Sequence, residues 1–166
     1  SDDRRLYALD AATGRQKWAF QAERRFFSSP AVVAGMVFVG SDDSKLYALD
    51  VSTGAKRWEF LTGWGVGSSP TVARGTVYVG SLDNKVYALD AQTGAKRWEF
   101  ATFGGVLSSP AVAEGTVYVG SLAHTVYALD AATGRQRWAS QTGASVSSSP
   151  AVASGLVFIG SDDRQL

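Results

Sequence analysis

Cysteine is absent from the 166-residue sequence, and histidine occurs only once, at His124. The lack of cysteine excludes disulfides, thiolate metal sites and a cysteine nucleophile. A single histidine argues against a multi-histidine metal site and against a histidine-activated nucleophile. No apolar run approaches the roughly 18 residues of a membrane span, and 16 basic residues nearly balance 15 acidic ones. We therefore expect no membrane insertion and no nucleic-acid partner.

The sequence also lacks an initial methionine and a signal peptide, and it begins in mid-pattern at Ser1. It looks like a piece of a larger protein whose targeting information lies elsewhere.

What the sequence does contain is an internal repeat with a spacing of 40 residues throughout. Tryptophan recurs in this register, as Trp18, Trp58, Trp98 and Trp138. A Ser-Pro pair recurs in the same way, ending at Pro30, Pro70, Pro110 and Pro150. The first six residues, Ser1–Leu6, return as Ser161–Leu166, so the chain holds four periods and six further residues.

Each period contains four short strand-like runs, which in one period span residues 29–33, 36–40, 45–50 and 56–61. Short runs rich in valine and aromatics, separated by turn residues, are typical of all-β proteins. A period near 40 residues with four strands predicts a β-propeller built from four-stranded antiparallel blades. The second and third runs are apolar at nearly every position, as expected for a blade that is covered on both faces.

The predicted strands divide the chain into a half blade at each end and three whole blades between them. The boundaries are residues 1–25, 26–65, 66–105, 106–145 and 146–166. The two end segments are complementary halves of one blade. The chain could therefore join its own ends into a four-blade ring, or two chains could exchange halves into an eight-blade ring. We expect a homo-oligomer that closes a larger ring, in which Ser1–Leu6 and Ser161–Leu166 claim the same position.

The turn between the third and fourth strands carries an aspartate and a glycine in every repeat. The aspartate accepts hydrogen bonds from the backbone that follows it, and glycine supplies positive φ. The ring of the tryptophan four residues later can cover the turn of the adjacent blade. A packing role explains why these residues occur once in every blade, whereas a catalytic or metal site need occur only once in the whole protein. The predicted structural residues are Asp10, Asp50, Asp90, Asp130, Gly14, Gly54, Gly94, Gly134, Trp18, Trp58, Trp98 and Trp138.

The pattern Ala8-x-Asp10-x-x-Thr13-Gly14-x-x-x-Trp18 resembles the tryptophan-docking motif of the pyrroloquinoline-quinone-type propellers. The resemblance implies that the motif holds blades together, that a ring has seven or eight blades, and that the setting is bacterial and extracytoplasmic. Members of this family include quinoprotein alcohol dehydrogenases, an outer-membrane-assembly lipoprotein and sensor domains of bacterial kinases.

The dehydrogenases of that family resemble one another in binding the quinone beside a Ca²⁺ ion, with an aspartate base, an arginine and often a vicinal disulfide. This sequence has no cysteine and no additional acidic cluster on an inner strand. We therefore predict no catalytic, metal-binding or cofactor-binding residues, and a non-catalytic binding, scaffold or ligand-sensing module. Two alternatives are a fragment of a quinone-dependent dehydrogenase and an excised or engineered repeat array without a function of its own.

Sequence variation is concentrated in the loops from the fourth strand to the next blade and in the bends from second to third strand. These two sets open on the same face of a propeller, and recognition usually lies in such loops. Phe27 and its equivalents are expected to pack between blades, and His124 is expected to be a solvated bend residue. The candidate contacts for a protein or small-ligand partner are Arg24, Arg25, Phe26, Trp64, Phe103 and His124.

Overall fold

The computed structural model describes residues 2–163, and the regular structure in this part of the chain is entirely β-strand. The N-terminal sheet is the hairpin of β1 (Arg5–Leu9) and β2 (Gln16–Gln21). The next sheet contains β3 (Ala31–Val33), β4 (Met36–Gly40), β5 (Lys45–Asp50) and β6 (Lys56–Leu61). It is followed by β7 (Thr71–Ala73), β8 (Thr76–Ser81), β9 (Lys85–Asp90) and β10 (Lys96–Ala101).

The remaining sheets repeat this pattern. One contains β11 (Ala111–Ala113), β12 (Thr116–Ser121), β13 (Thr125–Asp130) and β14 (Gln136–Gln141), and the C-terminal hairpin contains β15 (Ala151–Ala153) and β16 (Leu156–Phe158). Strands within each sheet are antiparallel neighbours in chain order. The all-β, four-stranded blades predicted from the sequence are thereby confirmed.

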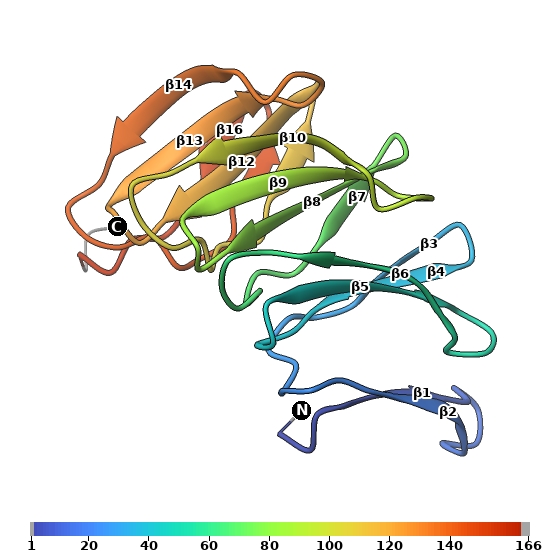
Figure 1. The fold of residues 1–166 in the computed structure, drawn as a ribbon. Helices are drawn as coiled ribbons and strands as arrows, with labels where there is room; N and C mark the ends of the chain where they lie inside the picture. Colours follow the sequence, from blue (N-terminus) through green and yellow to red (C-terminus); the bar gives the residue numbers. More distant parts are fainter. Residues whose placement is uncertain (1, 164–166) are drawn as a thin grey trace.

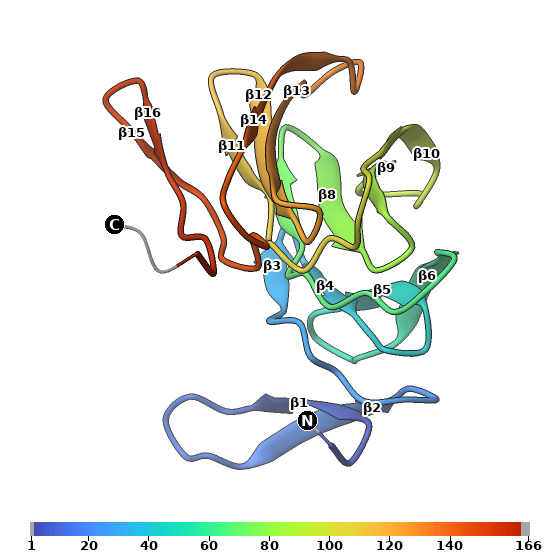
Figure 2. The same cartoon turned by 90° about the vertical axis from the view of Figure 1, so that its left-hand side faces the viewer.

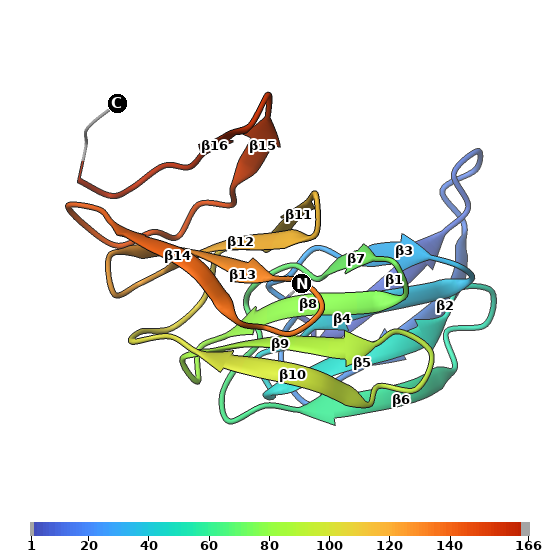
Figure 3. The ribbon, with the colours of Figure 1, turned by 90° about the horizontal axis from the view of Figure 1, so that it is seen from above.

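The sheets are arranged as an open fan (Figures 1 and 2). The β1–β2 and β15–β16 hairpins stand at its two ends (Figures 2 and 3), and among residues 2–163 they form two separate sheets with no hydrogen-bonded pairing between them. The arc of a single chain therefore leaves its ring unclosed.

The cores lie between successive sheets. Leu46 of β5 packs in one cluster with Val77 and Leu89 of the next sheet, and each of these side chains is fully buried. Every residue of β4 and β8 is buried. The apolar second and third strands thus place side chains against neighbours on both faces, as the sequence indicates.

The first strand of each four-stranded sheet is shorter than expected. The sequence predicts a strand over residues 29–33, but β3 begins at Ala31. The hydroxyl of Ser28 accepts a hydrogen bond from Gly40 N (2.7 Å) and donates one to Gly40 O (3.0 Å). Pro30 has no backbone N–H for strand pairing. A side chain therefore makes the contacts that a strand residue would make.

A β-bulge interrupts the pairing of β5 with β6. Ala48 lies opposite Trp58 and Leu49 lies opposite Lys56, so Arg57 is the additional residue. A bulge redirects the side chain that it carries. Here it places the Arg57 guanidinium 2.7 Å from Asp50.

Candidate interaction face

The variable loops rest on the bends of the following blade. The N–H of Asp42 donates to Arg25 O (3.0 Å), and the N–H of Leu82 donates to Gly65 O (3.0 Å) in the next repeat. Gly63 N also donates to the Asp83 carboxylate (2.6 Å). Backbone bonds therefore join loop and bend into one surface, which we call the loop face.

The structure brings Arg24 and Trp64 together on the loop face. Both line a hollow of about 420 Å³, whose other lining residues include Asp42, Asp43 and Ser44. Both side chains are exposed. The hollow combines an indole, a guanidinium and two carboxylates, which suits a partner that has both apolar and charged groups.

Arg25 lies beside this hollow and contacts Asp2, Asp42 and Phe27. Its guanidinium is 3.6 Å from the Asp42 carboxylate and lies 4.2 Å from the ring centre of Phe27. Such stacking of an arginine on an aromatic ring is a cation–π contact. It presents a flat, preorganised surface of two side chains.

The positions of Phe26 and Phe27 correct the sequence interpretation. Phe26 is 5% exposed and packs with Tyr47 in the core next to the first hairpin, whereas Phe27 is 58% exposed. Phe26 is in the register of Val66, which is fully buried against Gly40. Phe26 is therefore the interblade residue, and the expectation that Phe27 has that role is wrong.

Phe103 and His124 lie in the next blade's part of the loop face. Phe103 is 91% exposed. His124 is exposed and has a φ of 59°, as do Ser44 (70°) and Asn84 (68°) at the equivalent bend position. Asn and His are enriched in this left-handed conformation. The bend geometry thus accounts for His124.

The repeated tryptophans contact the next blade. Trp18, Trp58 and Trp98 each donate from Nε1 to a backbone oxygen 33 residues later, at 3.0, 3.1 and 3.0 Å. Their rings lie against the next repeat's glycine so closely that a Cβ on Gly94 would be 2.8 Å from Trp58. Gly94 also has a φ of +73°, a backbone conformation that disfavours every residue type except glycine.

Three of the repeated aspartates, Asp50, Asp90 and Asp130, cap their turns and bind an arginine. Asp50 accepts hydrogen bonds from Thr53 N (3.0 Å) and Thr53 Oγ1 (3.0 Å), and from Arg57. The Arg57 hydrogen bond is the largest cause that lowers the pKa of Asp50 to about 2. Asp90 and Asp130 have the same arrangement, with Arg97 and Arg137, and pKa values of about 2.

Sequence analysis missed these arginines and the hollow that they line. Arg97 and Arg137 border a space of about 470 Å³ between two blades, on the side of the repeated turns, together with Arg74 and Glu114. The sequence feature that could have indicated these arginines is the basic residue that precedes every repeated tryptophan. Arg97 and Arg137 are paired with aspartates, so we assign them to the scaffold.

One buried hydroxyl departs from the repeat. Tyr47 OH and Tyr87 OH donate to Asp43 and Asp83, at 2.8 and 2.7 Å. Tyr127 has Ala123 at that position, and its buried hydroxyl has no hydrogen-bond partner among the described residues.

Within residues 2–163, no group of three or more His, Cys, Asp or Glu side chains could hold a metal ion. No helix in the same range has the length and apolar character needed to cross a membrane.

The arc is similar to part of several longer chains whose structures have been solved. The chain is similar to BamB from Moraxella catarrhalis, with 26% identity and a TM-score of 0.86 over 97% of this chain and 50% of that one. It therefore spans about half the length of that protein. The computationally designed Ika8 protein gives a TM-score of 0.88 at 17% identity, over 98% of this chain and 51% of that one, and shows the fold alone.

A quinohemoprotein alcohol dehydrogenase, ADHIIG from Pseudomonas putida HK5, matches 69% of this chain and 20% of its own length, with 29% identity and a TM-score of 0.62. The search of curated proteins found no match. The family model described as outer membrane protein assembly factor BamB matches residues 1–99 and 53–166, which together cover the whole sequence. With its PQQ-like propeller repeats, the chain therefore belongs to the family of the outer membrane protein assembly factor BamB.

Proposed function

We propose that the chain is a non-catalytic β-propeller module of a larger bacterial protein, and that its loop face binds a protein or small-ligand partner. The observation that carries this proposal is the location of the sequence variation. Exposed aromatic side chains at Phe27, Trp64 and Phe103 lie in the variable loops. The turns on the opposite side repeat nearly the same sequence in every blade.

The chemistry of the loop face supports a binding role. Tryptophan, aromatic residues and arginine are enriched at interface hot spots. Trp64 and Arg24 share one hollow, and Arg25 stacks on Phe27. We propose that the repeated Asp, Gly and Trp residues form the docking motif that holds the blades in place, and that the arc self-associates into a closed ring.

Selection of a random peptide library on the chain tests the face. Peptides selected on the wild type should lose at least tenfold in affinity for a variant with Arg24, Arg25, Trp64 and Phe103 changed to serine. Those side chains are exposed, so the melting temperature should stay nearly unchanged.

The matched control changes four exposed residues of the opposite turns to serine, namely Arg15, Arg74, Gln92 and Glu114. Peptide affinity should be retained in this control. Peptides that bind the loop-face variant normally and fail on the control would reject the loop face as the binding surface.

A quinone-dependent dehydrogenase fragment is the second candidate, favoured by the match to ADHIIG. Titration with pyrroloquinoline quinone and Ca²⁺ separates the two. The binding proposal predicts no change in quinone absorbance and no shift in melting temperature. A saturable change in both would support the dehydrogenase instead.

A further inference from the structure

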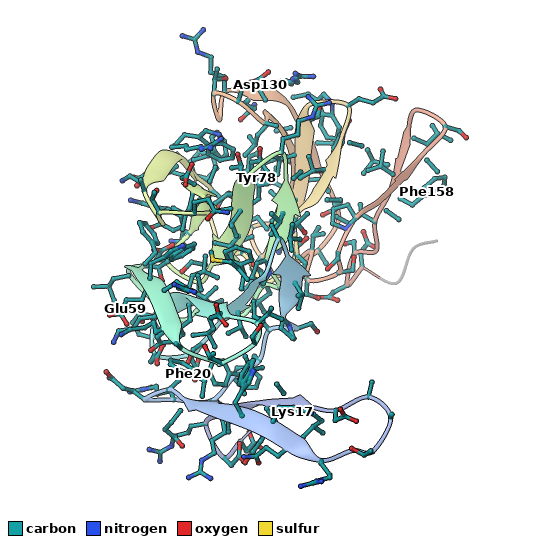
Figure 4. The ribbon with its side chains drawn as sticks, turned by 90° about the vertical axis from the view of Figure 1, so that its right-hand side faces the viewer. Lys17, Phe20, Glu59, Tyr78, Asp130 and Phe158 are labelled. Atoms are coloured by element: carbon teal, nitrogen blue, oxygen red, sulfur yellow. The ribbon has the colours of Figure 1, made fainter. Side chains whose placement is uncertain are left out.

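The hairpins at the two ends expose side chains that the complete sheets bury. Leu9 of β1 is 59% exposed, whereas Leu49, its equivalent in β5, is 0% exposed. Phe158 of β16 is 55% exposed (Figure 4), whereas Phe38 of β4 is 1% exposed. Because the sequence position is the same in each pair, the difference comes from the missing neighbour strands.

The two hairpins lack opposite halves of one sheet. β1 and β2 correspond to third and fourth strands, and β15 and β16 correspond to first and second strands. In a complete sheet Val37 lies opposite Leu49. The same register would place Val157 opposite Leu9, so the free edge of β16 fits the free edge of β1.

The tryptophan contact has the same complementarity. Trp98 lies over Gly134, 2.7 Å from where a Cβ would be, and donates to Ala131 O. Gly14 has a similar positive φ of +71°, but within residues 2–163 no heavy atom apart from Gly14 and its two chain neighbours lies within 4 Å of its Cβ position. Trp138 at the other end is 40% exposed. Each end thus holds one half of the contact.

A ladder of serines ends in the same way. Ser29 N donates to Ser69 Oγ (2.8 Å), Ser69 N to Ser109 Oγ (2.9 Å), and Ser109 N to Ser149 Oγ (3.1 Å). All three bonds run in one direction along the arc. Within residues 2–163 the ladder therefore ends with the N–H of Ser149 as a donor at one end and Ser29 Oγ as an acceptor at the other.

We propose that, in the polypeptide of residues 1–166, a second copy supplies both missing halves, so that β15–β16 of each copy completes a sheet with β1–β2 of the other. This inference rests on the proposed self-association and specifies its interface. Two such seams related by a twofold axis make a ring of eight sheets. This ring size is favoured by the match of the arc, with a TM-score of 0.86, to half of a chain about twice as long. Closed twofold assemblies are also the commonest oligomers.

One detail of the seam is already visible in the two ends. In a complete sheet Asp83 accepts hydrogen bonds from both Tyr87 OH and Gly63 N. At the ends these roles are divided, because Tyr7 OH donates to Asp3 and Gly143 N donates to Asp163. The completed sheet has room for one such aspartate, so one of the two duplicate bends moves aside on closure.

Disulfide trapping tests the seam, because the wild-type chain contains no cysteine. We expect the double variant Leu9→Cys, Val157→Cys to form covalent dimers on oxidation, with all four thiols consumed. The single variants Leu9→Cys and Val157→Cys should remain monomers on a non-reducing gel.

Four results would overturn the proposal. An oxidised monomer without free thiols would mean that the chain joins its own ends into a four-blade ring. A ladder of larger covalent species would mean open head-to-tail growth. Free thiols in a chain that is a dimer by light scattering would reject this seam and leave the proposed self-association standing. Free thiols in a chain that is a monomer by light scattering would reject both the seam and the self-association.

Discussion

Asp50, Asp90 and Asp130 make stability depend on pH. Their pKa values are about 2 in the folded chain, below the usual value of 3.8. A carboxyl whose pKa is lower in the folded state stabilises it above the unfolded pKa and stops doing so as the pH falls through the folded value. We therefore expect the melting temperature to fall steeply between about pH 4 and pH 2.

Replacing the three aspartates with asparagine checks this assignment. The triple variant should melt lower than the wild type at pH 7 and should lose less of its melting temperature on acidification. Glu114→Gln is the control, since Glu114 forms no ion pair within the described residues. An unchanged acid response in the triple variant would show that other groups control it.

Tyr127 provides a second prediction at the residue scale. Its buried hydroxyl has no hydrogen-bond partner within residues 2–163, and such a group costs about 1–3 kcal/mol. Tyr127→Phe should therefore leave the free energy of unfolding unchanged or raise it. Tyr87→Phe should lower that free energy by about 1 kcal/mol, because it removes a hydrogen bond to Asp83. Chemical denaturation measures both variants, and equal losses would contradict the assignment.

We expect the repeated tryptophans to stabilise the contacts between neighbouring blades by packing. Trp98 is buried in the core between two sheets and donates to Ala131 O. Trp98→Ala should lower the free energy of unfolding by about 3–5 kcal/mol, as other large-to-small core changes do. Trp64→Ala, at an exposed loop position, should change it by less than about 0.5 kcal/mol. A loss below about 1 kcal/mol for Trp98→Ala would remove this tryptophan from the core and reopen cofactor stacking.

The strands themselves could largely be predicted from the sequence. The runs at residues 36–40, 45–50 and 56–61 agree with β4, β5 and β6, since apolar residues bounded by Asp and Gly turns define them locally. The start of β3 depends on a hydroxyl that reaches Gly40, twelve residues away. Such a side-chain bridge has no local signal.

The candidate site was less predictable than the strands. Phe26 and Phe27 are adjacent and chemically equal, and only the path of the loop decides which one enters the core. The Arg57 contact with Asp50 depends on a bulge that no spacing of apolar residues reveals. Trp64 and Phe103, which the sequence analysis named as candidate contacts in the variable loops, are both exposed.

The whole molecule is an arc whose two ends complement each other. Phe20 lies between the first hairpin and the next sheet, 5.1 Å from Tyr47 (Figure 4), and the same ring pair recurs as Phe60 with Tyr87. In the last complete sheet, which lies next to the seam, Ser140 occupies the position of Phe20 and Phe60. The contact between the two copies therefore lacks one aromatic pair, and we expect the copies to separate before the sheets within one chain do.

Leu9 and Leu61 provide a matched pair for the assembly. Both are exposed leucines in the single chain. Only Leu9 becomes buried when the seam forms, so Leu9→Lys should shift the chain to the monomer, whereas Leu61→Lys should leave its mass unchanged. Circular dichroism should show the same β-strand content for both variants.

The mass of residues 1–166 in solution tests the central claim most directly. Sedimentation equilibrium over a range of concentrations should give twice the 17.5 kDa mass of the chain. It should approach the single-chain mass only on dilution. A species that remains at 17.5 kDa at every concentration and unfolds cooperatively would contradict the account.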